Sequence, residues 1–310
     1  MRRRDFLARG FGAAALAAAW RIDTAAQLPL AGMTGCASSR AAIRFGYAAI
    51  TWGDDDRRAI DDIAAVGFRG IQLRASAVAE WGQRPGELKE LLAARGLTFV
   101  ALSSGLVRLD PALEAEDLAL HVRHARFLRD AGGLYLQVLD ERPRERATAP
   151  EDYRRMGRLL TELGRRTADL GIPLGYHNHM GNLGQAPDEV ARVLDASDPR
   201  YVGLQLDTAH WSQAGGDPVE AVRRYADRLL FLHVKDLESP VHGQEARSYR
   251  FVGLGRGRLD FPAFFGALRD AGFDGWAIVE LDRTVEPGQT PKDSAVQARA
   301  YLEQTLGFRI

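Results

Sequence analysis

The chain has 310 residues, with 41 basic and 41 acidic side chains and therefore a formal net charge of zero. Apolar residues make up 46% and charged residues 26%, as in an ordinary soluble globular protein. Because there is no basic excess, the composition argues against a nucleic-acid partner and favours an enzyme or binding protein for a small molecule.

The first twenty residues differ in character from the rest. Arg2, Arg3 and Arg4 are followed by Phe6-Leu7 and then by a short apolar run, FGAAALAAAW. This arrangement resembles a twin-arginine export signal, whose apolar region is too short to remain as a membrane span. We therefore predict that residues 1–42 are an export signal and linker and that the protein is periplasmic. The alternative is a disordered basic start followed by an alanine-rich helix.

Cys36 is the only cysteine, so no internal disulfide can form. Its surroundings, Met33-Thr34-Gly35-Cys36-Ala37-Ser38, are similar to a lipoprotein lipobox. A lipid anchor at Cys36 is one reading, and a linker cysteine without a role is the other.

Strand-like and helix-like patterns alternate from residue 43 to the end of the chain. The apolar, β-rich runs are residues 43–50, 70–74, 97–103, 134–139, 173–178, 201–206, 229–234 and 276–281. They are continuous rather than alternating, as in parallel strands covered on both faces. Amphipathic helical stretches separate them. Eight such units predict a single-domain α/β fold, a (β/α)₈ TIM barrel over residues 43–310.

An open, doubly wound sheet is the competing architecture. Its first strand should be followed by a glycine-rich phosphate turn, but here the sequence reads TWGDDD. The run GLGRG at 253–257 does not lie between a strand and a helix in the dinucleotide pattern, so we do not expect a nicotinamide cofactor.

Four ionisable residues fall at or near the ends of the last four strand-like runs. They are His177, Asp207, His233 and Glu280. In a parallel barrel these ends open on one face, so the four side chains are expected to converge and bind a divalent metal. Three of them also have a structural alternative: a core histidine for His233, a helix N-cap for Asp207 and an ion pair for Glu280. For His177, Asn178 and His179 compete for the same role.

Two imidazoles and two carboxylates suit Mn²⁺, Co²⁺, Zn²⁺ or Fe²⁺ better than Mg²⁺. Such an ion polarises a sugar carbonyl and stabilises an enediolate. Trp52, at the end of the first strand, is expected to stack on the substrate or else to close the barrel core. His121 and His124, one turn apart, are expected to be solvated.

Several runs resemble the xylose-isomerase-like TIM-barrel superfamily, nearest to its inosose dehydratase-like branch. They are AAITWGDDD, GFRGIQLR, GYHNHMGN, LQLDTAHW, HVKD, GLGRGRLDF and IVELD. The resemblance implies a metal held by Asp207, His233 and Glu280, with His177 where the family usually has Glu. It also implies that Arg250 binds substrate and that His210 binds substrate or a second metal. Gln72 departs from a Glu that is frequent in the dehydratase-like members.

We therefore predict a metal-dependent isomerase or epimerase of a keto-sugar or cyclitol. Glu280 and His179 are the candidate acid and base, and Lys235 the candidate oxyanion stabiliser. One alternative is a dehydratase or lyase of an inosose or 3-keto-glycoside, which shares the first chemical step. The others are phosphodiester hydrolysis, as in endonuclease IV-type members, and a non-catalytic sugar-binding barrel.

Overall fold

The structure is a computed structural model that describes residues 42–238 and 249–310. The predicted export signal, Cys36 and the proposed boundary at residue 42 therefore lie at or outside the edge of the described residues. Among the described residues, every helix is too short or too polar to span a bilayer.

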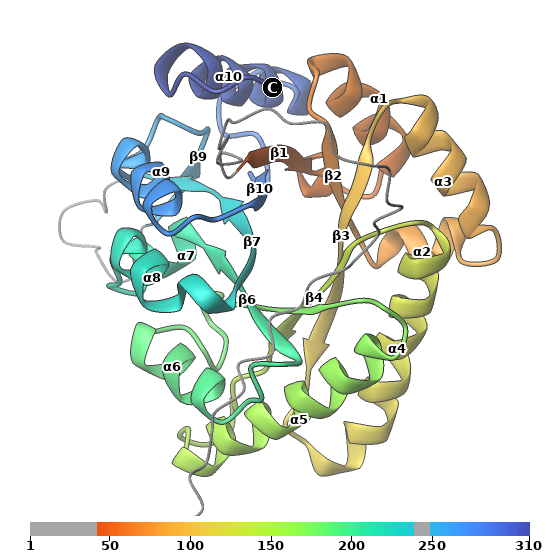
Figure 1. The fold of residues 1–310 in the computed structure, drawn as a ribbon, viewed down its shortest axis with the longest axis vertical. Coiled ribbons are helices and arrows are strands. Elements are labelled where there is room, and N and C mark those ends of the chain that lie inside the picture. Colours follow the sequence, from red (N-terminus) through yellow and green to blue (C-terminus); the bar gives the residue numbers. More distant parts are fainter. Residues whose placement is uncertain (1–41, 239–248) are drawn as a thin grey trace, which may run out of the picture. The chain divides into compact units, whose positions relative to one another are not determined.

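The predicted closed barrel is confirmed (Figure 1). Its parallel strands are β1 (Ile43–Ala48), β2 (Gly70–Arg74), β3 (Thr98–Val107), β4 (Tyr135–Asp140), β5 (Leu174–His177), β6 (Val202–Asp207), β7 (Leu229–Val234) and β10 (Gly275–Val279). They follow one another around the barrel in chain order, and β10 pairs with β1 to close it. Each predicted run overlaps one of these strands, because continuous apolar runs are what strands buried on both faces require.

A ring of helices surrounds the strands (Figure 1). The helices are α1 (Asp56–Val66), α2 (Ser76–Trp81), α3 (Pro85–Ala94), α4 (Glu114–Asp130), α5 (Pro150–Ala168), α6 (Pro187–Asp195), α7 (Thr208–Gln213), α8 (Pro218–Tyr225), α9 (Phe261–Asp270) and α10 (Pro291–Ala300). Short helical turns are η1 (Ala49–Trp52), η2 (Pro111–Leu113), η3 (Ala226–Arg228) and η4 (Tyr301–Thr305). A small hairpin, β8 (Asp236–Leu237) with β9 (Phe251–Val252), follows β7.

Helix α1 shows how local sequence sets these elements. Asp55 caps its N-terminus by accepting from the backbone N–H of Arg58, and Gly67 ends it with φ +104°. That conformation favours glycine because it has no Cβ. The apolar residues between them, including Ile60 and Ile63, face the barrel and are fully buried.

The barrel interior changes from apolar to polar along the strands. Phe231 and His233 are two residues apart on β7 and so point to the same side, since strand side chains alternate. Phe231 stacks on Tyr135 of β4, while His233 is hydrogen-bonded to Gln72 of β2. The apolar side chains inside the barrel, such as Phe231 and Tyr135, thus lie toward the amino ends of the strands. The polar side chains lie at the carboxyl ends.

Candidate metal centre

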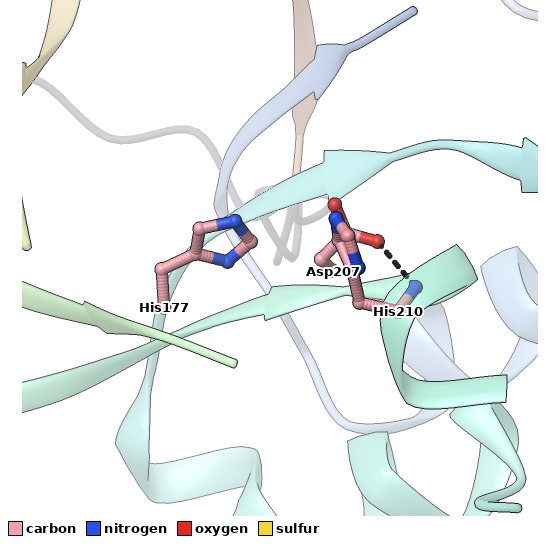
Figure 2. A group of neighbouring side chains, drawn as sticks. All are labelled: His177, Asp207 and His210. Carbon is pink, nitrogen blue, oxygen red and sulfur yellow. Dashed lines mark hydrogen bonds between the residues drawn. The ribbon is translucent and has the colours of Figure 1, made fainter. Parts of the chain in front are cut away.

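The four predicted metal ligands converge at the carboxyl ends of the strands. His177 and Asp207 are the last residues of β5 and β6, His233 is the fifth residue of β7, and Glu280 directly follows β10. All four are buried, Asp207 completely. Two overlapping trios have ligand atoms within 4.8 Å of one another: His177, Asp207 and His210, shown in Figure 2, and Asp207, His233 and Glu280.

Nδ1 of His233 faces two carboxylates. Its Nε2 lies 2.8 Å from Oε1 of Gln72, whose own amide N–H donates to Gln137 at 2.6 Å. Since an amide oxygen only accepts, Nε2 carries a hydrogen, and Nδ1 is the nitrogen that could bind a cation. Nδ1 is 3.5 Å from Oδ2 of Asp207 and 3.3 Å from Oε2 of Glu280. Three electron-rich atoms facing one another require a cation or a second ring proton.

Other atoms of the cluster also lack partners. Within the described residues, Nδ1 of His177, Oδ2 of Asp207 and Nδ1 of His233 are buried and make no hydrogen bond. Unpaired buried polar atoms are costly, so their gathering in one place fits a metal ion that they would ligate. Metal-binding histidines typically donate their other ring N–H to an oxygen of the protein, as His233 does to Gln72.

Asp207 caps a helix with one carboxylate oxygen and turns the other toward the cluster. Its Oδ1 accepts from the backbone N–H of His210 at 2.9 Å and caps α7, as Figure 2 shows. Its Oδ2 faces the cluster. The side chain of Asn178 holds the strand end in place, accepting from the N–H of Asp207 and donating to its carbonyl oxygen. Asn178 is therefore committed to the backbone, which leaves His177 as the ligand-type side chain of β5.

Lys235 is buried among acidic groups. Its ammonium donates to Oε1 of Glu280 at 3.0 Å and to Oδ1 of Asp282 at 2.6 Å, and lies 3.4 Å from Nε2 of His210. Burial acts to lower its pKa, but the carboxylates of Glu280, Asp207 and Asp282 outweigh burial and hold the pKa above its usual range. Lys235 is therefore a fixed positive charge at neutral pH. The ion pair of Glu280 is with this lysine.

The acidity of Glu280 is set by the same contacts. Burial acts to raise its pKa, but the neighbouring His233 and Lys235 lower the pKa to about 2. A carboxylate of such low pKa is a good ligand and a weak base. Its predicted role as acid or base stays a prediction.

His179 lies over the cluster and is only partly buried. Its Nδ1 is 2.7 Å from the carbonyl oxygen of Met180, so Nδ1 carries the hydrogen and Nε2 carries the lone pair. Its ring lies 3.9 Å from the ring of His210 and 5.6 Å from that of His177. Burial, with nearby positive charge, lowers the pKa of both His177 and His210 well below the ordinary value. Both rings are therefore neutral, as metal or substrate binding requires.

The segment that carries His179 is anchored by a buried carboxylate. Asp140, at the end of β4, accepts from the hydroxyl of Tyr176 at 2.5 Å and from the N–H groups of Leu183 and Gly184 at 3.0 and 2.7 Å. Arg142 donates to the carbonyl oxygens of Asn182 and Leu183. These bonds fix the chain between β5 and α6.

Trp52 and Arg250 were predicted to contact the substrate, and they lie in different surroundings. Trp52 is 9% exposed, packs edge-on against Tyr47 and donates to Asp62, which are the contacts of a core residue. Its predicted stacking on substrate stays a prediction. Arg250 is exposed and paired with Glu238 at 2.7 Å. It lines a cavity of about 640 Å³ together with Phe251 and Asp282, next to Lys235.

The prediction for His121 and His124 is wrong. They are 0% and 8% exposed, and both hydrogen-bond to the hydroxyl of Ser104 on β3. Leu118, His121, Ala125 and Leu128 follow helical spacing along the buried face of α4. That spacing is a signal in the sequence that identifies His121 and its neighbour as inward-facing.

Sequence reasoning missed Phe251 altogether. This β9 residue lies with its ring 4.1 Å from Nζ of Lys235 and 4.9 Å from the ring of His210. It provides the apolar surface beside the cluster that Trp52 was expected to provide. It lies between the strand-like run 229–234 and the run GLGRG at 253–257, where no strand pattern indicated its position.

These features define an α/β-barrel protein with a metal-type cluster at the mouth of the barrel. The model of the family described as "Xylose isomerase-like TIM barrel" matches residues 60–305, and the chain belongs to this family. The resemblance seen in the sequence is thereby confirmed.

The relatives are enzymes of sugar-like compounds. An inosose dehydratase of Lacticaseibacillus casei is 28% identical over 303 residues, covering 86% of this chain and 98% of the relative. Among solved structures, the IOLI protein with a binding zinc atom has a TM-score of 0.73 at 17% identity, covering 86% and 100%. L-ribulose 3-epimerase has a TM-score of 0.68 at 20% identity, covering 86% and 94%. The two structures show the shared fold, and the prediction of an enzyme is confirmed.

Proposed function

We propose that this protein is a divalent-metal-dependent dehydratase of a polyhydroxylated cyclic ketone of the inosose kind. The relatives favour this activity, named above as an alternative, over the isomerase or epimerase that stood first. Residues His177, Asp207, His233 and Glu280 hold the ion. One observation supports this proposal most strongly: His177, Asp207 and His233 each direct a buried ligand atom without a hydrogen-bond partner into one cluster.

The donor set fits a transition-metal ion such as Mn²⁺, Co²⁺, Zn²⁺ or Fe²⁺, since it offers two imidazole nitrogens and two carboxylate oxygens. A divalent ion held there polarises the substrate carbonyl and stabilises negative charge on its oxygen. The ammonium of Lys235, buried and fixed by Glu280 and Asp282, adds a second positive charge for the same oxygen.

Nε2 of His179 is the proposed base, because its lone pair is free of Met180 and its ring lies over the cluster. It takes the proton from the carbon beside the carbonyl. The electron pair of that C–H bond then forms a carbon–carbon double bond as the hydroxyl leaves the next carbon. The proton on His179 passes to the departing hydroxyl, which leaves as water, and no oxidant or reductant is needed.

An isomerase or epimerase is the second candidate, since it shares the first step and differs in returning the proton to carbon. His210, Arg250 and the cavity beside Phe251 are the proposed substrate contacts. A non-catalytic sugar-binding barrel would use the same residues without removing a proton.

One experiment separates these three functions. The metal-loaded protein is incubated with an inosose in D₂O, and the solution is followed by ultraviolet absorbance and by NMR. A dehydratase produces an absorbing conjugated product. An isomerase or epimerase produces deuterium at the α-carbon without that product. Recovery of unlabelled inosose, repeated with a panel of keto-sugars, would contradict enzymatic enolisation.

A further inference from the structure

The ammonium of Lys235 is surrounded by atoms that ordinarily ligate metals. Oε1 of Glu280, Oδ1 of Asp282 and Nε2 of His210 lie 3.0, 2.6 and 3.4 Å from Nζ. The ring of Phe251 closes a further side at 4.1 Å. Two carboxylate oxygens around one position form a cation site, and here the cation belongs to the chain.

This position adjoins the proposed metal centre through a shared residue. Oε1 of Glu280 binds Lys235, while Oε2 faces Nδ1 of His233 at 3.3 Å. Glu280 therefore bridges the ammonium and the cluster. A carboxylate bridging two cations is the arrangement of two-metal sites, in which the ions lie about 3.5–4 Å apart.

The charges balance for one divalent ion. Asp207, Glu280 and Asp282 bring three negative charges to the region, and Lys235 contributes one positive charge. One divalent ion completes neutrality, and a second would leave two positive charges in excess, which is costly in a buried site. Without the ammonium, two divalent ions would leave only one.

The trio of His177, Asp207 and His210 does not provide a binding site for a second metal ion. Oδ1 of Asp207 is occupied by the backbone of His210, so only Oδ2 remains. Nδ1 of His210 accepts from the N–H of Met180 at 3.2 Å. A neutral imidazole accepts at one nitrogen only, so this bond and a metal at Nε2 exclude each other. Of the three groups around Lys235, the carboxylates of Glu280 and Asp282 are therefore the ones that can bind a second metal ion.

We propose that the ammonium of Lys235 takes the place of a second metal ion, so that the centre holds one divalent ion rather than two. The inference rests on the proposed metal-dependent function and specifies the stoichiometry of its site. Removing the ammonium but leaving its carboxylates should convert the centre into a two-metal site, which the cavity lined by Asp282 makes reachable from solvent.

The test counts Mn²⁺ ions bound to the full chain by equilibrium dialysis and examines their electron paramagnetic resonance. Wild-type protein should bind one ion per chain, with an uncoupled spectrum. Lys235→Ala should bind two, with the spectrum of a spin-coupled pair. Lys235→Met is the matched control: it also removes the charge but fills the space, and it should bind one.

Two ions in the wild type, or a single ion in Lys235→Ala at saturation, overturn this inference and leave the proposed function standing. A wild-type chain that binds no ion overturns the proposed metal dependence and the inference together. Should Lys235→Ala fail to fold, the wild-type count and spectrum decide, because one uncoupled ion supports the proposal and a coupled pair contradicts it.

Discussion

Gln72 on β2 and His233 on β7 are 161 positions apart in the chain and meet inside the barrel, with Oε1 of Gln72 accepting from Nε2 of His233 at 2.8 Å. The bond fixes which nitrogen of His233 faces Asp207 and Glu280. It links the geometry of the barrel to the chemistry of the cluster.

Gln72→Leu should weaken metal binding by about 10- to 100-fold, the usual loss when the residue that hydrogen-bonds a ligand histidine is removed. The affinity is measured by titration with Zn²⁺ or Mn²⁺. Gln205→Leu is the control, because the amide of Gln205 is also buried in the barrel but makes no hydrogen bond within the described residues. Equal metal affinity in wild type and Gln72→Leu would show that Gln72 does not orient His233 for metal binding.

His179→Gln should lower kcat by about 10²- to 10⁴-fold, the range expected for loss of a general base. The metal content should remain that of the wild type, because the proposed ligands lie on other residues. The measurement is steady-state kinetics with the substrate found in the D₂O experiment, alongside elemental analysis. Unchanged kcat would exclude His179 as the base.

Asp140 should make stability depend on pH in a defined window. Burial raises its pKa from 3.8 to about 6, although Tyr176 and two backbone N–H groups act to lower it. The folded protein thus holds this proton more tightly than the unfolded chain. Its contribution to the free energy of unfolding is full below about pH 4 and is lost as the pH rises to about 6, by roughly 3 kcal/mol in total.

Chemical denaturation across this range checks the effect. Asp140→Asn should lack this part of the decline. Tyr176→Phe removes a hydrogen bond that lowers the pKa, so its decline should extend to higher pH. A wild type and an Asp140→Asn variant with parallel pH profiles would show that the group does not titrate as stated.

Export is the prediction that concerns the N-terminus. We propose that Arg3 and Arg4 belong to a twin-arginine signal, so replacing both with Lys should retain the protein in the cytoplasm. Cell fractionation followed by immunoblotting is the measurement. Replacing Arg9 with Lys is the control, since Arg9 lies outside the arginine pair. Periplasmic accumulation of the double variant would refute the targeting prediction.

The strands and the metal cluster could be predicted because each rests on a local signal. A buried parallel strand is a visible apolar run, and the residue at its carboxyl end has a fixed place in a barrel. His177, Asp207, His233 and Glu280 were found in this way. Their convergence follows from closure of the sheet and does not depend on any other long-range contact.

The remaining contacts depend on distant partners. Nothing near Gln72 indicates His233, and nothing near Lys235 indicates Asp282, because each pair meets only after the barrel closes. Phe251 lies beside the cluster because β9 pairs with β8, which begins directly after Lys235. The prediction for His121 and His124 is wrong because distance from the mouth of the barrel does not imply exposure, and both lie on the buried face of α4.

The metal content of Asp207→Asn tests the central claim most directly. Wild-type protein should contain one transition-metal ion per chain by elemental analysis, and Asp207→Asn should contain almost none. Asp140→Asn is the matched control, since Asp140 is another fully buried carboxylate at the end of a barrel strand, and it should keep the metal. If Asp207→Asn retained a full complement of metal, the ion would lie elsewhere and the account of this centre would be contradicted.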